Sequence, residues 1–336
     1  MVNVSFPGLG IGEFSFNKVA FTIPIGSGVE VRWYGIIITV GIILGLLYAS
    51  HRAKHEGISF DDLLDITIFT VIFAIIGARL YYVIFSEDTY ETFYDVIAIW
   101  NGGIAIYGAI IAGALTIVAV CKYKKIKITK ALDMAAPAVM IGQIIGRWGN
   151  FTNGEAYGYA VKESEFLYFM RMGLSKGSAT IQNYVHPTFL YESLWNLVGF
   201  LIINALYKKK KFDGQIVLMY ATWYGFGRMF IEGLRTDSLP IGIFRVSQIV
   251  GFVCFAAGLT LLIVFLEKAR RKELSGRAYE SVYSKAFAAN NNEDTTESTA
   301  SEKTEEEVEE AVVADEDISD KLKNLFNDET EEKGEE

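Results

Sequence analysis

Cysteine and histidine are scarce in this chain of 336 residues, which has two of the first and three of the second. Cys121 and Cys254 lie in separate apolar runs, and neither has a second cysteine at motif spacing. The sequence therefore predicts neither a disulfide framework nor a cysteine metal site. Zinc-type clusters, nucleophile elbows and phosphate-loop signatures are also missing. We expect no metal and no other cofactor.

The N-terminus lacks a basic stretch that leads into a short apolar run, so a cleaved signal peptide is not predicted.

Basic residues are also rare near the C-terminus. From Glu293 to Glu336 there are nineteen acidic and four basic residues, a net charge of -15, which leaves +6 of the overall -9 for the rest. The basic part suits anionic lipid surfaces, and we expect no nucleic-acid partner. The acidic part, rich in Glu, Thr and Ser beyond about Ala289, is predicted to be a disordered, solvating tail.

Long apolar runs dominate the remaining sequence, which is 51% hydrophobic over the whole chain. A helix needs about 20 apolar residues to cross a bilayer, so these runs predict an all-α integral membrane protein with seven transmembrane helices. The fourth and sixth runs are short or polar for a span. The predicted spans are Trp33–Ser50, Asp65–Phe85, Ile104–Cys121, Ala131–Ile145, Thr188–Leu206, Gln215–Phe230 and Val246–Leu266.

The charges between these runs alternate. Lysine and arginine gather after the first, third, fifth and seventh runs, whereas 86–100 has none and holds four acids. The positive-inside rule then places the N-terminus outside and the C-terminus in the cytoplasm.

Three regions follow from this layout. We expect residues 1–32 to form an extracytoplasmic N-terminal segment, residues 33–275 the seven-helix membrane domain, and residues 276–336 the cytoplasmic acidic disordered tail. Within the second region, 158–185 is too long for a tight connection and too polar to span, so it predicts a small extracytoplasmic subdomain or cap.

The most informative stretch runs from Gly146 to Gly158, where an apolar run ends in Arg147, Asn150, Asn153 and Glu155. Ionised groups beside a span are costly and indicate a functional site. A guanidinium can hold two phosphate oxygens at once, so this stretch suits a phosphate near the bilayer surface. The alternative is polar bridging between helices, in which Gln143, Arg147 and Asn150 share one helix face.

A second polar face lies in the sixth run. Tyr224, Arg228, Glu232 and Arg235 are spaced by four, four and three residues, which puts them on one side of a helix. Snorkelling to the interface explains Arg235 more easily than Arg228, which lies deeper among apolar residues.

Three other polar residues have open interpretations. Arg79 is as consistent with a structural ion pair as with a ligand contact, and Asp133 is a candidate buried acid with a structural role. His186 could be a general base, since histidine titrates near neutral pH, or a capping and hydrogen-bonding group.

Several segments, in order, resemble the prolipoprotein diacylglyceryl transferase family. They are Arg32-Trp33-Tyr34-Gly35, Gly77-Ala78-Arg79-Leu80, Trp100-Asn101-Gly102-Gly103 with Tyr107-Gly108, the Gly146–Gly158 stretch, His186-Pro187-Thr188 with Leu190-Tyr191-Glu192, and Tyr224 with Arg228, Glu232 and Arg235. The resemblance implies a multi-pass enzyme of the bacterial cytoplasmic membrane with seven spans. It implies transfer of a diacylglyceryl group from phosphatidylglycerol to the lipobox cysteine of a prolipoprotein signal peptide. A thioether forms and glycerol phosphate leaves.

The resemblance also implies the site residues. The catalytic candidates are Arg147, Arg228, Tyr34, Tyr107 and Glu155. The substrate-binding candidates are Arg147, Asn150, Asn153, Gly158, Gly102, Gly108, Tyr224, Glu232 and Arg235. Fixed arginines in a water-poor site would stabilise charge on the leaving phosphate and help a thiol to ionise.

The chain departs from the family pattern at Tyr107, where the family often has histidine. Tyrosine is a poor base at neutral pH, because its pKa is about 10. Glu155 and His186 are then candidate bases, unless no protein base is needed, and Tyr107 could instead position the headgroup.

Two other classes of protein remain as alternatives. A transporter or lipid channel could line its path with these charges, although no internal repeat is evident and the charges gather on one side. A different phospholipid transferase or a phosphodiesterase could use the same arginines with water or an alcohol as acceptor. The sequence leaves open the base, the acyl-chain preference, the signal-peptide route, the oligomeric state and the role of the tail.

Overall fold

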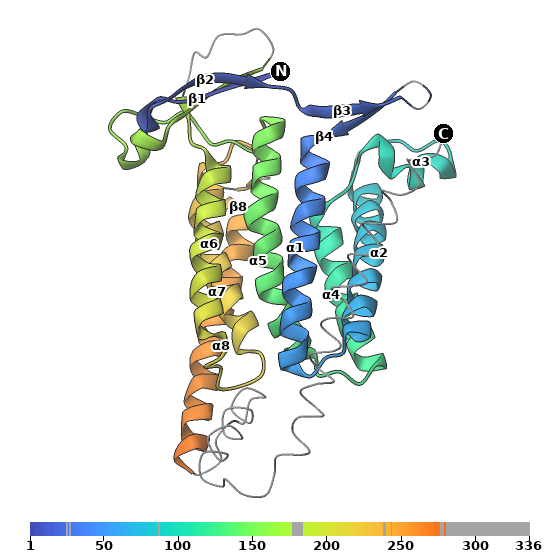
Figure 1. Ribbon diagram of the computed structural model, residues 1–336, viewed down its shortest axis with the longest axis vertical. Coiled ribbons are helices and arrows are strands. Elements are labelled where there is room, and N and C mark those ends of the chain that lie inside the picture. Colours follow the sequence, from blue (N-terminus) through green and yellow to red (C-terminus); the bar gives the residue numbers. More distant parts are fainter. Residues whose placement is uncertain are drawn as a thin grey trace, which may run out of the picture. The chain divides into compact units, whose positions relative to one another are not determined.

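The computed structural model describes residues 1–24, 26, 28–86, 88–176, 184–237, 240–242, 244–275 and 279. Helices dominate this part of the chain (Figure 1). The long ones are α1 (Trp33–Glu56), α2 (Phe60–Phe85), α4 (Ile106–Tyr123), α5 (Ile128–Asn153), α6 (Thr188–Tyr207), α7 (Gln215–Leu234) and α8 (Val246–Leu274). All of these except α7 are long and apolar enough to cross a membrane, which gives six candidate spans among the described residues. The predicted helical membrane protein is thus confirmed at this level.

The helix ends explain where the Gly146–Gly158 stretch, called the signature stretch from here on, lies. The fourth predicted span covers only the middle of α5, which continues to Asn153 and ends at Gly154 in the left-handed conformation (φ 59°). Gly146 to Asn153 are therefore the last two turns of α5, so Arg147 and Asn150 project from a rigid helix. We call this end of the bundle, where α5 ends and α1 begins, the Arg147 end.

Glycines allow the helices to approach closely, and α1 packs on α5, α2 on α4, α5 on α6, and α7 on α8. At Gly108 of α4, an added Cβ would lie 2.3 Å from the carbonyl oxygen of Gly77 in α2. Gly225 of α7 likewise faces the backbone of Gly251 in α8, where a Cβ would lie 2.6 Å from the carbonyl oxygen. Small residues at such contacts are typical of helix packing in membranes.

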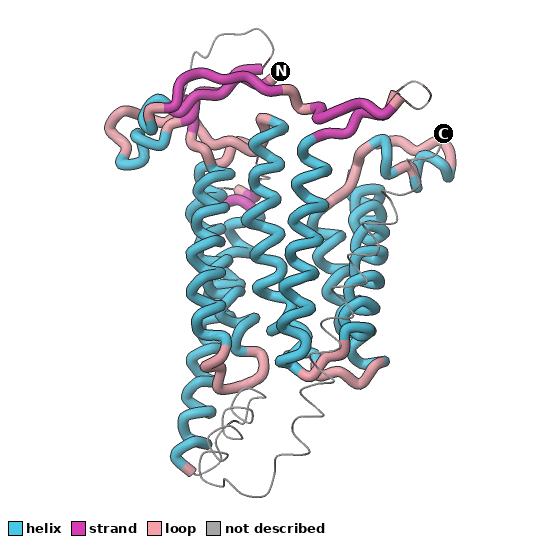
Figure 2. Tube along the Cα trace, viewed as in Figure 1, coloured by secondary structure: helices cyan, strands magenta, loops and turns pink. Residues whose placement is uncertain are grey.

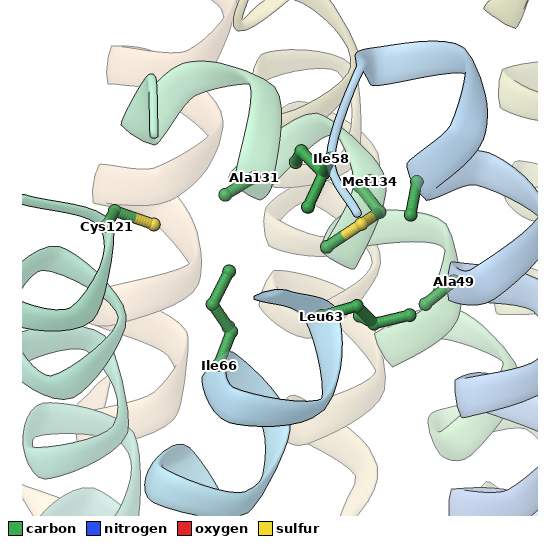
Figure 3. Close-up of a cluster of buried hydrophobic side chains, with 8 residues drawn as sticks. Ala49, Ile58, Leu63, Ile66, Cys121, Ala131 and Met134 are labelled. Carbon is green, nitrogen blue, oxygen red and sulfur yellow. The ribbon is translucent and has the colours of Figure 1, made fainter. Parts of the chain in front are cut away.

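A hydrophobic cluster and a buried ionic cluster join the helices at the opposite end. Figure 3 shows the first cluster, in which Cys121 of α4 packs with Leu63 and Met134, in agreement with a core cysteine. In the second, the Lys210 ammonium lies 2.6 Å from Glu56 Oε2 and 3.3 Å from Asp133 Oδ2. Asp133 also accepts hydrogen bonds from the backbone N–H groups of Gly214 and Val217, which fixes the start of α7. The predicted structural role of Asp133 agrees with these contacts.

Strands cover the Arg147 end, as Figure 2 shows. The sequence predicted an outer segment and a cap but no sheet. The N-terminal residues form β1 (Val2–Phe6), β2 (Ile11–Phe16) and a hairpin of β3 (Val19–Ile23) with β4 (Val29–Arg32). The segment after α5 adds β5 (Met172–Lys176) and β6 (Tyr184–Val185), in an antiparallel sheet of order β2-β1-β5-β6. Val2 and Val4 are fully buried. They pack with Met172 of β5 and with Phe189 of α6, so the sheet is anchored on the bundle.

Shorter elements complete the described part. They are η1 (Pro7–Leu9), α3 (Phe93–Ile97), η2 (Ile99–Asn101), η3 (Phe166–Met170), β7 (Pro240–Ile241) and β8 (Phe244–Arg245). The predicted tail, 276–336, lies outside the described residues except for Tyr279, whose hydroxyl donates a hydrogen bond to Asp213.

Candidate active site

A single buried carboxylate joins the two predicted catalytic arginines. Glu192, on α6, places Oε1 2.7 Å from Arg147 Nη2 on α5 and Oε2 2.9 Å from Arg228 Nη1 on α7. Its side chain is 2% exposed, whereas those of Arg147 and Arg228 are 18% and 13% exposed. The Glu192 carboxylate is therefore less accessible than either guanidinium.

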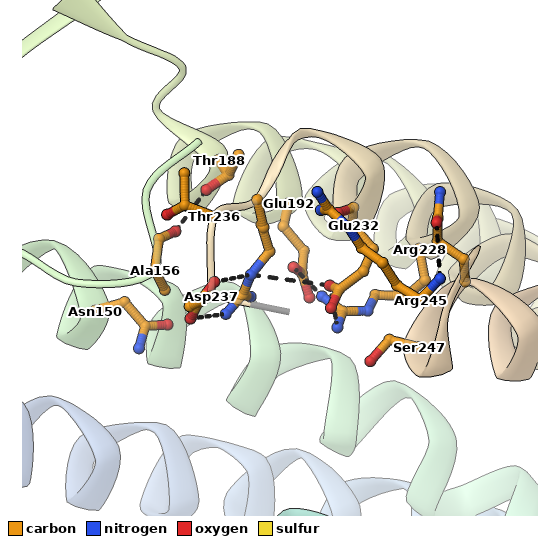
Figure 4. Close-up of polar contacts among 12 residues, drawn as sticks. Asn150, Ala156, Thr188, Glu192, Arg228, Glu232, Thr236, Asp237, Arg245 and Ser247 are labelled. Carbon is orange, nitrogen blue, oxygen red and sulfur yellow. Dashed lines mark hydrogen bonds and ion pairs between the residues drawn. The ribbon is translucent and has the colours of Figure 1, made fainter. Parts of the chain in front are cut away.

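The ionic contacts continue along the end of α7, as Figure 4 shows. Arg228 Nη2 lies 2.6 Å from Glu232 Oε2, and Arg235 Nε lies 3.8 Å from the same oxygen. Arg235 also donates two hydrogen bonds to Asp237, of 3.0 and 2.8 Å. Burial would raise the pKa of the Asp237 carboxyl, but the hydrogen bonds and charge of Arg235 outweigh it and lower that pKa.

We call these six residues the arginine cluster: Arg147, Arg228 and Arg235 with Glu192, Glu232 and Asp237. Their formal charges cancel, which lets three guanidiniums sit close together in a low-dielectric setting. A guanidinium has five N–H donors, and the contacts of Arg147 and Arg228 with the described residues use only some of them. The remaining donors can hold a phosphate.

The amides of the signature stretch extend the cluster toward Glu155. Asn150 Oδ1 accepts a 3.1 Å hydrogen bond from Arg147 Nη1, and Asn150 Nδ2 donates to Glu155 Oε1 at 3.2 Å. Asn153 donates to the same oxygen at 3.1 Å. The Tyr34 ring packs over Gly149, where an added Cβ would lie 2.8 Å from it. The structure thus brings Arg147, Asn150, Asn153 and Glu155 together, and Tyr34 lies beside this end of α5.

Gly158 and His186 have structural surroundings. The Gly158 N–H donates to the His186 carbonyl at 2.9 Å, and an added Cβ would lie 2.7 Å from His186 Cβ. Gly158 also bridges Arg235, which links the signature stretch to the end of α7. Both nitrogens of the His186 ring are engaged, with Glu165 Oε2 at 2.9 Å and the Tyr191 hydroxyl at 3.2 Å. These contacts match the capping and hydrogen-bonding interpretation of His186.

Arg79 on α2, Gly102 just after η2, and Tyr107 and Gly108 on α4 lie outside the arginine cluster, as does Tyr224 on α7. Arg79 donates to four backbone carbonyls, those of Asp95, Val96, Gly102 and Gly103, at 2.6 to 2.8 Å. Four of its five N–H donors are thus used to fix the segment before α4, which favours the structural interpretation. Gly102 supplies one of those carbonyls, and Gly108 lies at the contact with α2.

Comparison with known proteins agrees with this assembly of residues. The model of the family "Prolipoprotein diacylglyceryl transferase" matches residues 18–264, which include every member of the arginine cluster. The chain belongs to this family. It is 46% identical over 252 residues to the phosphatidylglycerol–prolipoprotein diacylglyceryl transferase of Finegoldia magna, covering 74% of this chain and 96% of that protein. The enzyme of the same name from Streptococcus pyogenes serotype M5 is 46% identical over 248 residues, covering 72% and 92%.

Glu192, Arg245 and Ser247 lie in or beside the arginine cluster but were not among the predicted site residues. Glu192 belonged to a quoted segment, and an acid inside a predicted span was itself a signal of function. Ser247 of α8 lies 3.0 Å from the Tyr107 hydroxyl, and Figure 4 places it near Arg228 and Arg245. Arg245 donates to the Glu232 carbonyl and to the Tyr159 hydroxyl, the latter at 2.8 Å. Only the fold brings the last two near α7, so no local pattern could have found them.

Proposed function

We propose that this chain catalyses the first step of lipoprotein maturation in the bacterial cytoplasmic membrane. The diacylglyceryl group of phosphatidylglycerol moves to the lipobox cysteine of a prolipoprotein signal peptide. The cysteine sulfur bonds to the terminal glyceryl carbon, the bond from that carbon to the phosphate oxygen breaks, and glycerol phosphate leaves. The observation that carries the proposal is the pair of guanidiniums held together by buried Glu192 at one end of an apolar bundle.

In this proposal Arg147 and Arg228 bind the phosphate of the donor. Negative charge grows on the phosphate oxygens as the carbon–oxygen bond breaks, and preorganised cations in a water-poor site stabilise that charge. Asn150, Asn153 and Tyr34 supply neutral donors around the headgroup. Glu232 holds Arg228 in place and also contacts Arg235, and Gly158 fixes the cap beside them.

The thiol proton goes to Glu155. Its partners are the neutral amides of Asn150 and Asn153, both on Oε1. Glu155 is exposed, whereas Glu192 is buried and contacts two arginines. The His186 nitrogens are engaged in the cap. Tyr107, whose hydroxyl is hydrogen-bonded to that of Ser247, positions the headgroup rather than accepting the proton.

We expect Glu155→Gln to lower the transfer rate about a hundredfold at neutral pH, the lower end of the range for general bases. A thiol with a pKa near about 8.5 ionises unaided in alkali, so much of the rate should return near pH 9.5. Transfer to a lipobox peptide measures both. Glu163→Gln, the same change on the exposed cap, is the control. A Glu155→Gln enzyme as active as wild type at neutral pH would assign the proton to another group.

The proposal places α7 as a seventh span and the Arg147 end outside the cell. The loop charges support this orientation by the positive-inside rule. Arg228 and Glu232 make α7 less apolar than its neighbours. Arg228 pairs with Glu192 of α6 and with Glu232 itself, which satisfies that charge inside the bundle.

Labelling of single cysteines tests the orientation. In a chain whose Cys121 and Cys254 are replaced by alanine, Glu91→Cys should react with an impermeant maleimide on intact cells. Lys125→Cys should react only after the cells are opened. The reverse pattern would place the site on the cytoplasmic side and contradict the proposal.

A further inference from the structure

A second polar layer lies one helical turn below the arginine cluster. Gln143, Asn196 and Tyr224 lie four residues from Arg147, Glu192 and Arg228 on the same three helices, α5, α6 and α7. Residues four apart share a helix face and differ by about 6 Å in height. Because α5 and α7 run toward the Arg147 end and α6 runs away from it, all three lie on the deeper side.

This layer contains polar atoms without partners. Asn196 is fully buried, and neither its Nδ2 nor its Oδ1 has a hydrogen bond with the described residues. Gln143 donates to the Tyr220 hydroxyl at 2.8 Å, but its buried Oε1 also has no partner there. Tyr224 stacks on Tyr220, with ring centroids 5.6 Å apart, and is partly exposed. A buried amide without hydrogen bonds destabilises the protein unless a ligand or water satisfies it.

We propose that Asn196 and Tyr224 bind the ester carbonyl oxygens of the diacylglyceryl donor, an inference that rests on the proposed function. In a phospholipid, the two ester carbonyls lie a few bonds deeper in the bilayer than the phosphate, about the offset between the two layers. Asn196 Nδ2 and the Tyr224 hydroxyl are donors, and carbonyls are acceptors. Acyl chains farther down carry no acceptor, so a donor at this depth matches the esters.

Such contacts would hold the reacting carbon from both sides. The arginine cluster would fix the phosphate above it and the amide layer the esters below it, which orients the carbon for attack by sulfur. The competing explanation is a buried water that bridges Asn196 and Gln143 without contacting the lipid. The two explanations differ in whether the enzyme distinguishes ester-linked from ether-linked donors.

Diether phosphatidylglycerol, which keeps the headgroup and chains but lacks both carbonyls, is the decisive probe. With a labelled headgroup and a lipobox peptide, wild type should use the diester at least tenfold better in kcat/KM, since a site built for an acceptor rejects an analogue without one. Asn196→Leu should lower diester transfer and bring the ratio close to one. Asn196→Asp, which has the same size but loses the NH2 donor, should do the same if the leucine variant does not fold.

Asn204→Leu is the matched control, on the same helix two turns farther from the cluster. Its amide oxygen already accepts a 2.8 Å hydrogen bond from the Tyr48 hydroxyl, so the diester preference should equal that of wild type. Equal use of both lipids by wild type, or an unchanged preference in both Asn196 variants, would overturn the inference and leave the bridging water. Thermal stabilisation of the purified protein by each lipid gives the same comparison without transfer. If the diester lipid stabilised the protein more than the diether lipid did, but no diacylglyceryl transfer occurred, the result would count against the proposed function and not against this inference.

Discussion

Arg147→Lys is expected to lower kcat/KM for diacylglyceryl transfer by about two to three orders of magnitude, the loss typical of a removed charge-stabilising donor. The Arg147 guanidinium contacts Glu192 on one side and Asn150 on the other, at 2.7 and 3.1 Å. An ammonium keeps the charge but is a single point with no planar fork. It cannot make both contacts and still present two donors to a phosphate. Initial rates with phosphatidylglycerol and a lipobox peptide measure the effect.

Arg271→Lys is the control for this change, because Arg271 lies at the far end of α8 with a side chain that is 78% exposed. Its rate should match that of wild type. The Arg147→Lys protein should remain folded, since lysine can still pair with Glu192, and its helix content and melting temperature check this. A rate within about threefold of wild type would reduce Arg147 to a structural ion pair.

Glu192→Gln is expected to reduce both stability and turnover. The change leaves Arg147 and Arg228 buried without the carboxylate between them, and breaking a buried pair typically costs about 3–5 kcal/mol. The guanidiniums then repel each other and lose the geometry that the proposed reaction requires. We expect a fall in kcat of about a hundredfold or more, which exceeds the effect of partial unfolding at the assay temperature. Thermal melting in detergent and initial rates below the melting temperature separate the two effects.

The matched variant is Glu163→Gln, which removes one acid from the exposed surface of the cap. It should change neither the melting temperature nor the rate. A Glu192→Gln protein that melts lower but retains the wild-type kcat would show that Glu192 supports the bundle without serving the reaction.

The helices were predictable because their apolar runs are long and their limits carry local signals. The predicted first and fifth spans begin at Trp33 and Thr188, where α1 and α6 begin. The predicted spans ended early where polar residues continue the helix, as in α5 beyond Ile145. Among the strands of residues 1–32, β1 also pairs with β5, about 170 residues later, and no local pattern reveals that pairing.

The candidate site was predictable in part, because some of its residues carry a local signal. Arg147 and Arg228 stood out as cations beside apolar runs, and their spacing put their neighbours on the same helix faces. Their connection through Glu192 depends on how α5, α6 and α7 pack. Arg79 also stood out as a cation within an apolar run, and the sequence suggested a ligand contact or an ion pair for it. Its charge is instead satisfied by four backbone carbonyls of a segment that only the fold brings to it.

The most direct test of the central claim is transfer from labelled phosphatidylglycerol to a synthetic lipobox peptide by the purified protein. Peptides with cysteine and with serine at the acceptor position are compared side by side, in detergent and in liposomes. The account predicts label on the cysteine peptide alone, release of glycerol phosphate, and loss of both in Arg147→Ala. No transfer in either medium, or equal label on the serine peptide, would contradict a thiol-specific diacylglyceryl transferase built around Arg147, Glu192 and Arg228.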